Sequence, residues 1–85
     1  MTRREKLVAD VLGGRADANI DFDDLRGLLL LYGFDERTKG SHHLFRKSGI
    51  EERINLQHDG RNAKPYQVKQ VRAVILKYNL AGNDE

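Results

Sequence analysis

The chain contains no cysteine, and its longest run of apolar residues covers only positions 28–32. Without cysteine, the chain has neither a disulfide framework nor a thiolate zinc site, and its composition suits a reducing cytoplasm. A membrane-spanning helix needs about 18 consecutive apolar residues, far more than this run supplies. The sequence therefore predicts no signal peptide, no transmembrane helix and no membrane partner, and it predicts a cytoplasmic protein.

The chain is also short, at 85 residues, which predicts a single domain because a second core would have too few residues. A domain of this size buries only about 60–65% of its unfolded surface, so its core is thin. A large enzyme with a nucleotide-binding sheet is excluded. Any chemistry must come from a few side chains on a small scaffold.

The formal net charge is +2, but the charged residues are unevenly distributed along the chain. Residues 1–36 hold five basic and eight acidic side chains, whereas residues 37–77 hold ten basic and three acidic ones, a net charge of +7. A basic region on a small domain is typical of proteins that bind phosphate-bearing partners. An ordinary solvated surface that is locally basic is the alternative interpretation.

Three helices are expected from the spacing of apolar residues. The first covers residues 2–12 and ends at Gly13. The second begins after Asp21, whose carboxylate can accept from the free amides of the first turn, and it ends at Gly33. The third covers residues 65–78 and begins with the single proline, which suits a first helical turn. On this last helix Lys69 and Arg72 are expected to face water, and Asn79 or Gly82 to end it.

Three short strands are expected at residues 34–39, 42–47 and 53–58, with turns at residues 40–41 and 59–62. Short strands with tight connections form an antiparallel meander. Such a sheet must bury its apolar face against helices, so the order α-α-β-β-β-α predicts an α+β two-layer sandwich with the helices on one face. The other face would stay open for a polar site.

Two neighbouring histidines, His42 and His43, are the candidate catalytic residues of the sequence, because histidine can transfer protons near neutral pH. Adjacent strand residues point to opposite faces, so if Phe45 faces the core, His43 shares its side. His42 then lies on the other face with Leu44 and Arg46. The alternative is that Leu44 is the core residue and the two histidines exchange roles.

Other chemistries have little support in the sequence. A metal site built from His42, His43 and His58 is not expected, because adjacent strand residues diverge and no carboxylate lies at a ligand-like spacing. The chain also has no phosphate-binding loop, no nucleophile elbow and no Ser/His/Asp signature. His43 alone is better explained as a packed or hydrogen-bonded structural residue.

Between residues 20 and 80 the chain resembles the HicA family, the toxins of HicAB toxin–antitoxin systems. The central segment of the resemblance is Gly40-Ser41-His42-His43-Leu44-Phe45, which follows Gly33-Phe34 and precedes the proline-led helix. The other matching segments are Phe22-Asp23-Asp24-Leu25, Leu28-Leu29, Asn55-Leu56-Gln57, Ala63-Lys64-Pro65-Tyr66-Gln67-Val68 and Gln70-Val71-Arg72. The resemblance implies one HicA-like domain over residues 1–85, with a core at 21–80 and an N-terminal extension at 1–20 that adds a helix. It also implies a fold similar to the double-stranded-RNA-binding domain.

The resemblance further implies a type II toxin that acts as an mRNA interferase, an endoribonuclease that cleaves single-stranded RNA with a histidine and needs no metal or other cofactor. By that likeness His42 is the catalytic residue, and Ser41 and His43 are supporting or alternative residues. The basic side chains expected to bind RNA are Lys39, Arg46, Lys47, Lys64, Lys69 and Arg72. The implied protein partner is a HicB-like antitoxin. The alternative function is a non-catalytic RNA-binding or protein-interaction module on the same scaffold.

Overall fold

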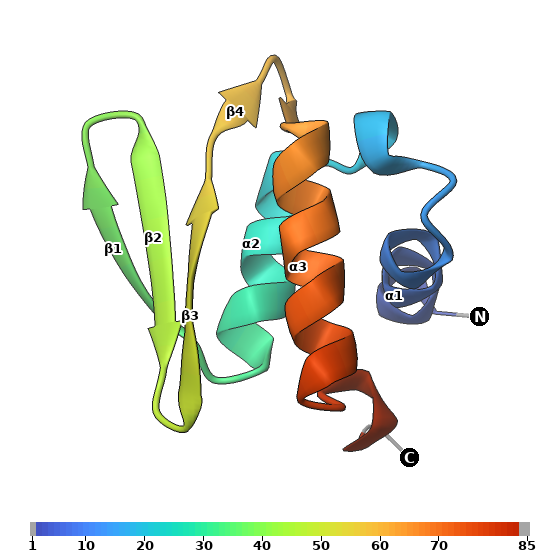
Figure 1. Ribbon diagram of the computed structural model, residues 1–85. Helices are drawn as coiled ribbons and strands as arrows, with labels where there is room; N and C mark the ends of the chain where they lie inside the picture. Colours follow the sequence, from blue (N-terminus) through green and yellow to red (C-terminus); the bar gives the residue numbers. More distant parts are fainter. Residues whose placement is uncertain (1, 84–85) are drawn as a thin grey trace.

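The computed structural model describes residues 2–83 and has the predicted α+β architecture, with a three-stranded antiparallel sheet on one side and helices on the other (Figure 1). The helices are α1 (Arg3–Gly13), α2 (Phe22–Leu31) and α3 (Pro65–Lys77). A short 3-10 turn, η1 (Asp17–Asn19), lies between α1 and α2, and a second, η2 (Ala81–Asn83), follows α3. The strands of the main sheet are β1 (Asp35–Lys39), β2 (His42–Lys47) and β3 (Ile50–Leu56). A second, two-stranded ribbon is formed by β4 (His58–Asp59) and β5 (Asn62–Ala63).

The helix starts follow the capping residues of the sequence. Thr2 and Glu5 form a reciprocal capping box at the start of α1. The Asp21 carboxylate accepts from the amide of Asp24 at the start of α2, and Pro65 occupies the first turn of α3. The third helix ends as predicted near Asn79, which takes a left-handed conformation with a φ of 53°. All three predicted helices are confirmed to within about two residues at each end.

The sheet has the order β1-β2-β3, and both pairs are antiparallel. Gly40 and Ser41 form the two-residue connection between β1 and β2, and Gly40 has a φ of 60°. A glycine with positive φ at the first central position is typical of a type II′ hairpin turn, whose twist matches that of the flanking strands. This turn places Lys39 directly opposite His42.

The predicted third strand, residues 53–58, is wrong at both ends. Ser48 and Gly49 form a tight turn, so β3 starts directly after it at Ile50 and ends at Leu56. His58 lies in β4, which pairs with β5 across the predicted turn. An isolated bridge from Asp21 to Asn62 ties this ribbon to the start of α2.

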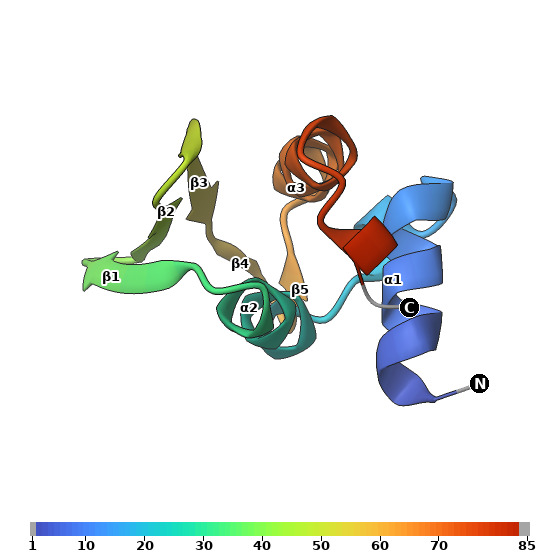
Figure 2. The same cartoon turned by 90° about the horizontal axis from the view of Figure 1, so that it is seen from below.

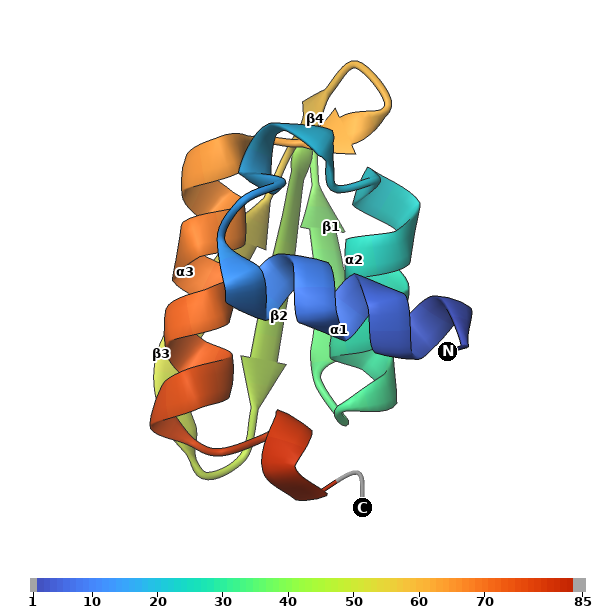
Figure 3. The ribbon, with the colours of Figure 1, turned by 90° about the vertical axis from the view of Figure 1, so that its right-hand side faces the viewer.

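The core lies between the sheet and the helix pair α2 and α3, while α1 packs on the outer side of that pair (Figure 2). In a view from the helix side, α1 crosses in front of α2 and α3, with the sheet behind them (Figure 3). Fifteen apolar residues form one buried cluster: Val11, Ile20, Phe22, Leu25, Leu28, Leu29, Phe34, Phe45, Ile54, Leu56, Ala63, Val68, Val71, Val74 and Ile75. Because Val11 belongs to this cluster, the N-terminal extension is part of the fold.

Arg72 of α3 connects α1 and η1 to the rest of the molecule through hydrogen bonds. Its guanidinium donates to the Val11 carbonyl oxygen at 3.1 Å and to both carboxylate oxygens of Asp17 at 2.9 and 3.2 Å. The expectation that Arg72 faces water is therefore wrong, since its side chain is only 18% exposed. The packing of α3 directs the Arg72 side chain toward α1 and η1. There it supplies a hydrogen-bond donor to a carbonyl oxygen in the last turn of α1.

Across residues 2–83, no helix combines the length and the apolar character that crossing a membrane would require.

Candidate functional site

The face of the sheet that α2 and α3 leave uncovered carries the candidate site (Figures 1 and 2). The register places alternate residues of each strand on this open face. From β2 they are His42, Leu44 and Arg46, from β1 they are Asp35, Arg37 and Lys39, and from β3 they are Arg53 and Asn55. We call this set the open face.

His42 lies at the β1–β2 turn end of the open face, and its side chain is exposed. Phe45, three residues along, is 0% exposed in the core, which confirms that His43 and not His42 shares the side of the helices. The alternative in which Leu44 is the core residue is wrong. The Nδ1 atom of the His42 ring lies 3.3 Å from the Oδ1 atom of Asn55 on β3.

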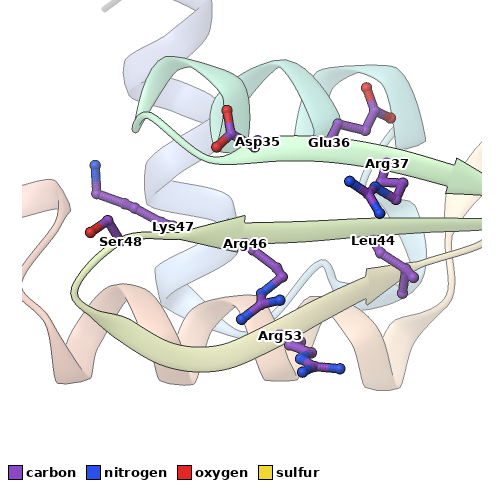
Figure 4. A pocket seen from close by; sticks show the side chains of 8 residues that line it. All are labelled: Asp35, Glu36, Arg37, Leu44, Arg46, Lys47, Ser48 and Arg53. Atoms are coloured by element: carbon purple, nitrogen blue, oxygen red, sulfur yellow. The ribbon is translucent and has the colours of Figure 1, made fainter.

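A shallow depression of about 640 Å³ lies on the open face beyond His42 (Figure 4). Three arginines, one from each strand, line it: Arg37, Arg46 and Arg53. Leu44 forms an apolar part of its floor, and Asp35 and Glu36 are the acidic residues at its border. Three guanidinium groups around one depression make it suited to polyanions, because each presents a fork of N–H donors.

Arg37 and Arg53 were not among the residues expected to bind RNA. The signal that identifies them is strand alternation counted from His42 across the hairpin, which puts both on the same face as Arg46. The predicted strand over residues 53–58 already puts Arg53 on the face opposite Ile54 and Leu56. The pairing of β2 with β3 shows that this is also the face of His42.

His43 lies on the opposite face, where it packs among the helices' side chains. Its Nδ1 atom donates to the Glu36 carboxylate at 2.9 Å, and its ring meets the Phe22 ring edge-on at a centroid distance of 4.8 Å. The Arg26 side chain of α2 donates to both oxygens of the same carboxylate at 2.8 Å. The hydrogen bonds from Arg26 first, and then from His43, lower the pKa of Glu36 below its usual range.

His58 lies beyond Phe22, with the two rings stacked at a centroid distance of 3.6 Å. His43 and His58 thus contact the same phenyl ring, and their own centroids are 6.0 Å apart. Among residues 2–83, no group of three histidine, cysteine or acidic side chains is arranged to hold a metal ion. Glu36 and His43 are thus hydrogen-bonded to each other on the covered side of the sheet, whereas His58 stacks on Phe22 from an exposed position in β4.

The remaining predicted site residues lie in three places. Lys39, Ser41 and Arg46 lie with His42 on the open face or its turn. Lys47 lines the far end of the depression, and its ammonium reaches over Gly33 at the end of α2, where the helix dipole favours a cation. Lys64, Lys69 and Arg72 belong to α3 or its N-cap in the helix layer, and Arg72 is paired with Asp17.

No known protein-family model, curated protein or solved structure matches this chain. The resemblance to HicA toxins rests on the motif residues themselves, and it stays a prediction.

What the arrangement can do chemically follows from its parts. An exposed imidazole, held by a neutral amide, lies at one end of a face that carries four cations, and such an imidazole can take up or release a proton beside a bound polyanion.

Proposed function

We propose that this protein is a HicA-like endoribonuclease that cleaves single-stranded RNA on the open face, with His42 as the catalytic residue and no metal ion. One observation carries the proposal: the histidine of the Gly-Ser-His-His segment is exposed on the face that also holds the arginine-lined depression. Proton transfer and phosphate binding are the two requirements of RNA cleavage by a ribose 2′-hydroxyl. The open face offers both.

In the proposed reaction the neutral His42 ring accepts the proton of a ribose 2′-hydroxyl. The 2′-oxygen forms a bond to the adjacent phosphorus while the bond from phosphorus to the 5′-oxygen breaks. The leaving 5′-oxygen takes a proton from water, and His42 later returns its proton to the solvent. The products are a 2′,3′-cyclic phosphate and a 5′-hydroxyl end, so atoms and charge balance without an oxidant or a metal.

The cations of the open face have two roles in this proposal. Lys39 lies directly opposite His42, so it is placed to stabilise the charge that develops on the scissile phosphate. Arg46 lies four residues along β2, about 13 Å from His42 at the rise of a strand. The arginines of the depression therefore bind phosphates that flank the cleavage position, and they contribute to affinity more than to the chemical step.

The proposed setting is the cytoplasm of a bacterium or an archaeon, with mRNA as the substrate. The proposed protein partner is a HicB-like antitoxin that covers the open face. A partner with acidic residues would complement Arg37, Arg46 and Arg53, and it would exclude RNA from the same surface.

The test uses the purified full-length chain with end-labelled single-stranded RNA in the presence of a chelator. We expect cleavage to fragments that carry 2′,3′-cyclic phosphates, identified by mass spectrometry, and no cleavage when the ribose at the site is replaced by deoxyribose. His42→Gln should be inactive with an unchanged melting temperature. Equal activity of the variant would show that His42 is not catalytic, and RNA binding without cleavage by the native chain would support the non-catalytic module instead.

A further inference from the structure

Asn55 is the polar side chain that contacts the ring of the proposed catalytic histidine. It is half-buried near the end of β3, opposite Leu44, and therefore lies diagonally across from His42 on the same face. Its Oδ1 atom lies 3.3 Å from Nδ1 of His42. Since β3 ends at Leu56, Asn55 is the last residue of this strand that can reach the histidine from the open face.

The direction of this contact determines where the ring carries its proton. An amide oxygen accepts hydrogen bonds and cannot donate them, so Nδ1 must be the donor. In a neutral imidazole only one nitrogen carries hydrogen, and Nε2 is then left with a free lone pair. In free histidine the opposite tautomer, with the proton on Nε2, predominates.

We propose that Asn55 is a positioning residue: it holds neutral His42 as the Nδ1–H tautomer and leaves Nε2 as the proton acceptor on the open face. The charged neighbours in register are Lys39, directly opposite on β1, and Arg37, two pairs further along on the same face. Both are cations that donate and do not accept, so neither competes for the Nδ1 proton. The role of the tautomer in cleavage rests on the proposed function, whereas the tautomer itself does not.

The first measurement needs no activity. Ring nitrogen chemical shifts of the full-length protein, recorded well above the ordinary histidine pKa of about 6.5, distinguish the two tautomers. The His42 signals are assigned by their loss in His42→Gln. We expect the Nδ1–H form in the native chain and in Asn55→Asp, whose carboxylate also only accepts, and a shift toward the Nε2–H form in Asn55→Leu. A native His42 with its proton on Nε2 would overturn the inference.

The second measurement is cleavage of RNA by the same variants, with the melting temperature as a check on folding. Asn55→Leu should lower kcat about fivefold to tenfold, the effect of losing one neutral hydrogen bond, with little change in KM. Asn55→Asp should keep most of kcat and raise KM, because it adds a negative charge to the RNA-binding face. If Asn55→Leu changes the tautomer but not kcat, the tautomer does not serve cleavage. If the native chain has the expected tautomer but cleaves no RNA, the proposed function fails and the positioning of the ring stands.

Discussion

His42 and His43 are neighbours in β2, but they lie in two very different environments. His42 is exposed on a face with three arginines and a lysine, and its partner is a neutral amide. His43 is 20% exposed, hydrogen-bonded to a carboxylate and packed against Phe22. One peptide unit therefore separates a histidine that is open to solvent from one that packs against the helices. The residue type and even the hydrogen-bonding nitrogen are the same, and only the face of the sheet differs.

The carboxylates of the sheet show the same contrast. Glu36 on β1 and Glu52 on β3 are each bonded to a cation of the helix layer, Arg26 and Lys77 respectively. These contacts neutralise the acidic groups on the covered side, while the arginines of the open face stay available. The sheet therefore divides the charges of the basic region between its two faces. Glu36 and Glu52 are paired with cations on the covered side, and the arginines lie on the open face.

The largest expected effect comes from exchanging the two histidines for glutamine one at a time. His42→Gln should lower RNA cleavage by about 10²–10⁴-fold, the usual contribution of general acid–base catalysis, and leave the melting temperature unchanged. His43→Gln should show the reverse: a lower melting temperature with cleavage reduced much less. Cleavage assays and thermal unfolding of both variants check this contrast. A His43→Gln protein that is stable but inactive would assign the chemistry to the covered face.

The next effect concerns the arginines. Replacing Arg37, Arg46 and Arg53 with glutamine should weaken RNA binding and reduce the slope of log affinity against log salt by about 2, if each arginine contacts one phosphate of a single strand. The measurement is a fluorescence anisotropy titration at several salt concentrations. The matched control replaces Arg3, Arg4 and Lys6 of α1, which changes the charge equally on the far side of the helices. Equal losses from both triple variants would indicate non-specific attraction by net charge.

The sequence predicted the helices, the first two strands and the face of His42, because capping residues and strand alternation are local signals. It missed the early start of β3, because the third predicted strand begins only at residue 53, whereas the turn at Ser48 and Gly49 leads directly into Ile50. It also missed the contacts that span long separations. Arg72 and Asp17 form an ion pair although they are 55 positions apart in the sequence. Glu36 accepts hydrogen bonds from Arg26 of α2 and His43 of β2. Residue spacing along the chain predicts neither contact.

A smaller effect is expected at Glu36, whose side chain is 12% exposed. Glu36→Gln replaces an acceptor-only carboxylate with an amide, which cannot accept from both Arg26 and His43 as strongly. Leaving such groups poorly paired costs about 1–3 kcal/mol of unfolding free energy. Urea unfolding measures the loss, and Glu51→Gln, on the exposed side chain next to Glu52, is the control. Equal stability of the two variants would show that the Glu36 network does not stabilise the covered face.

The smallest effect is the pH dependence that Glu52 contributes. The ammonium of Lys77 and then the hydroxyl of Tyr78 donate to this carboxylate and lower its pKa from 4.5 to about 2. A carboxyl whose pKa is lower in the folded state stabilises the fold above its unfolded pKa, and that contribution is lost as the pH falls from about 4.5 toward 2. Glu52→Gln should therefore have a melting temperature slightly below that of the native protein at neutral pH, and this difference should disappear on acidification through this range.

Because Glu52 anchors β3 to α3 on the side away from His42, cleavage at neutral pH should be unchanged. A difference in melting temperature that stays constant with pH would mean that packing of the side chain, and not its charge, holds the end of α3 to the sheet.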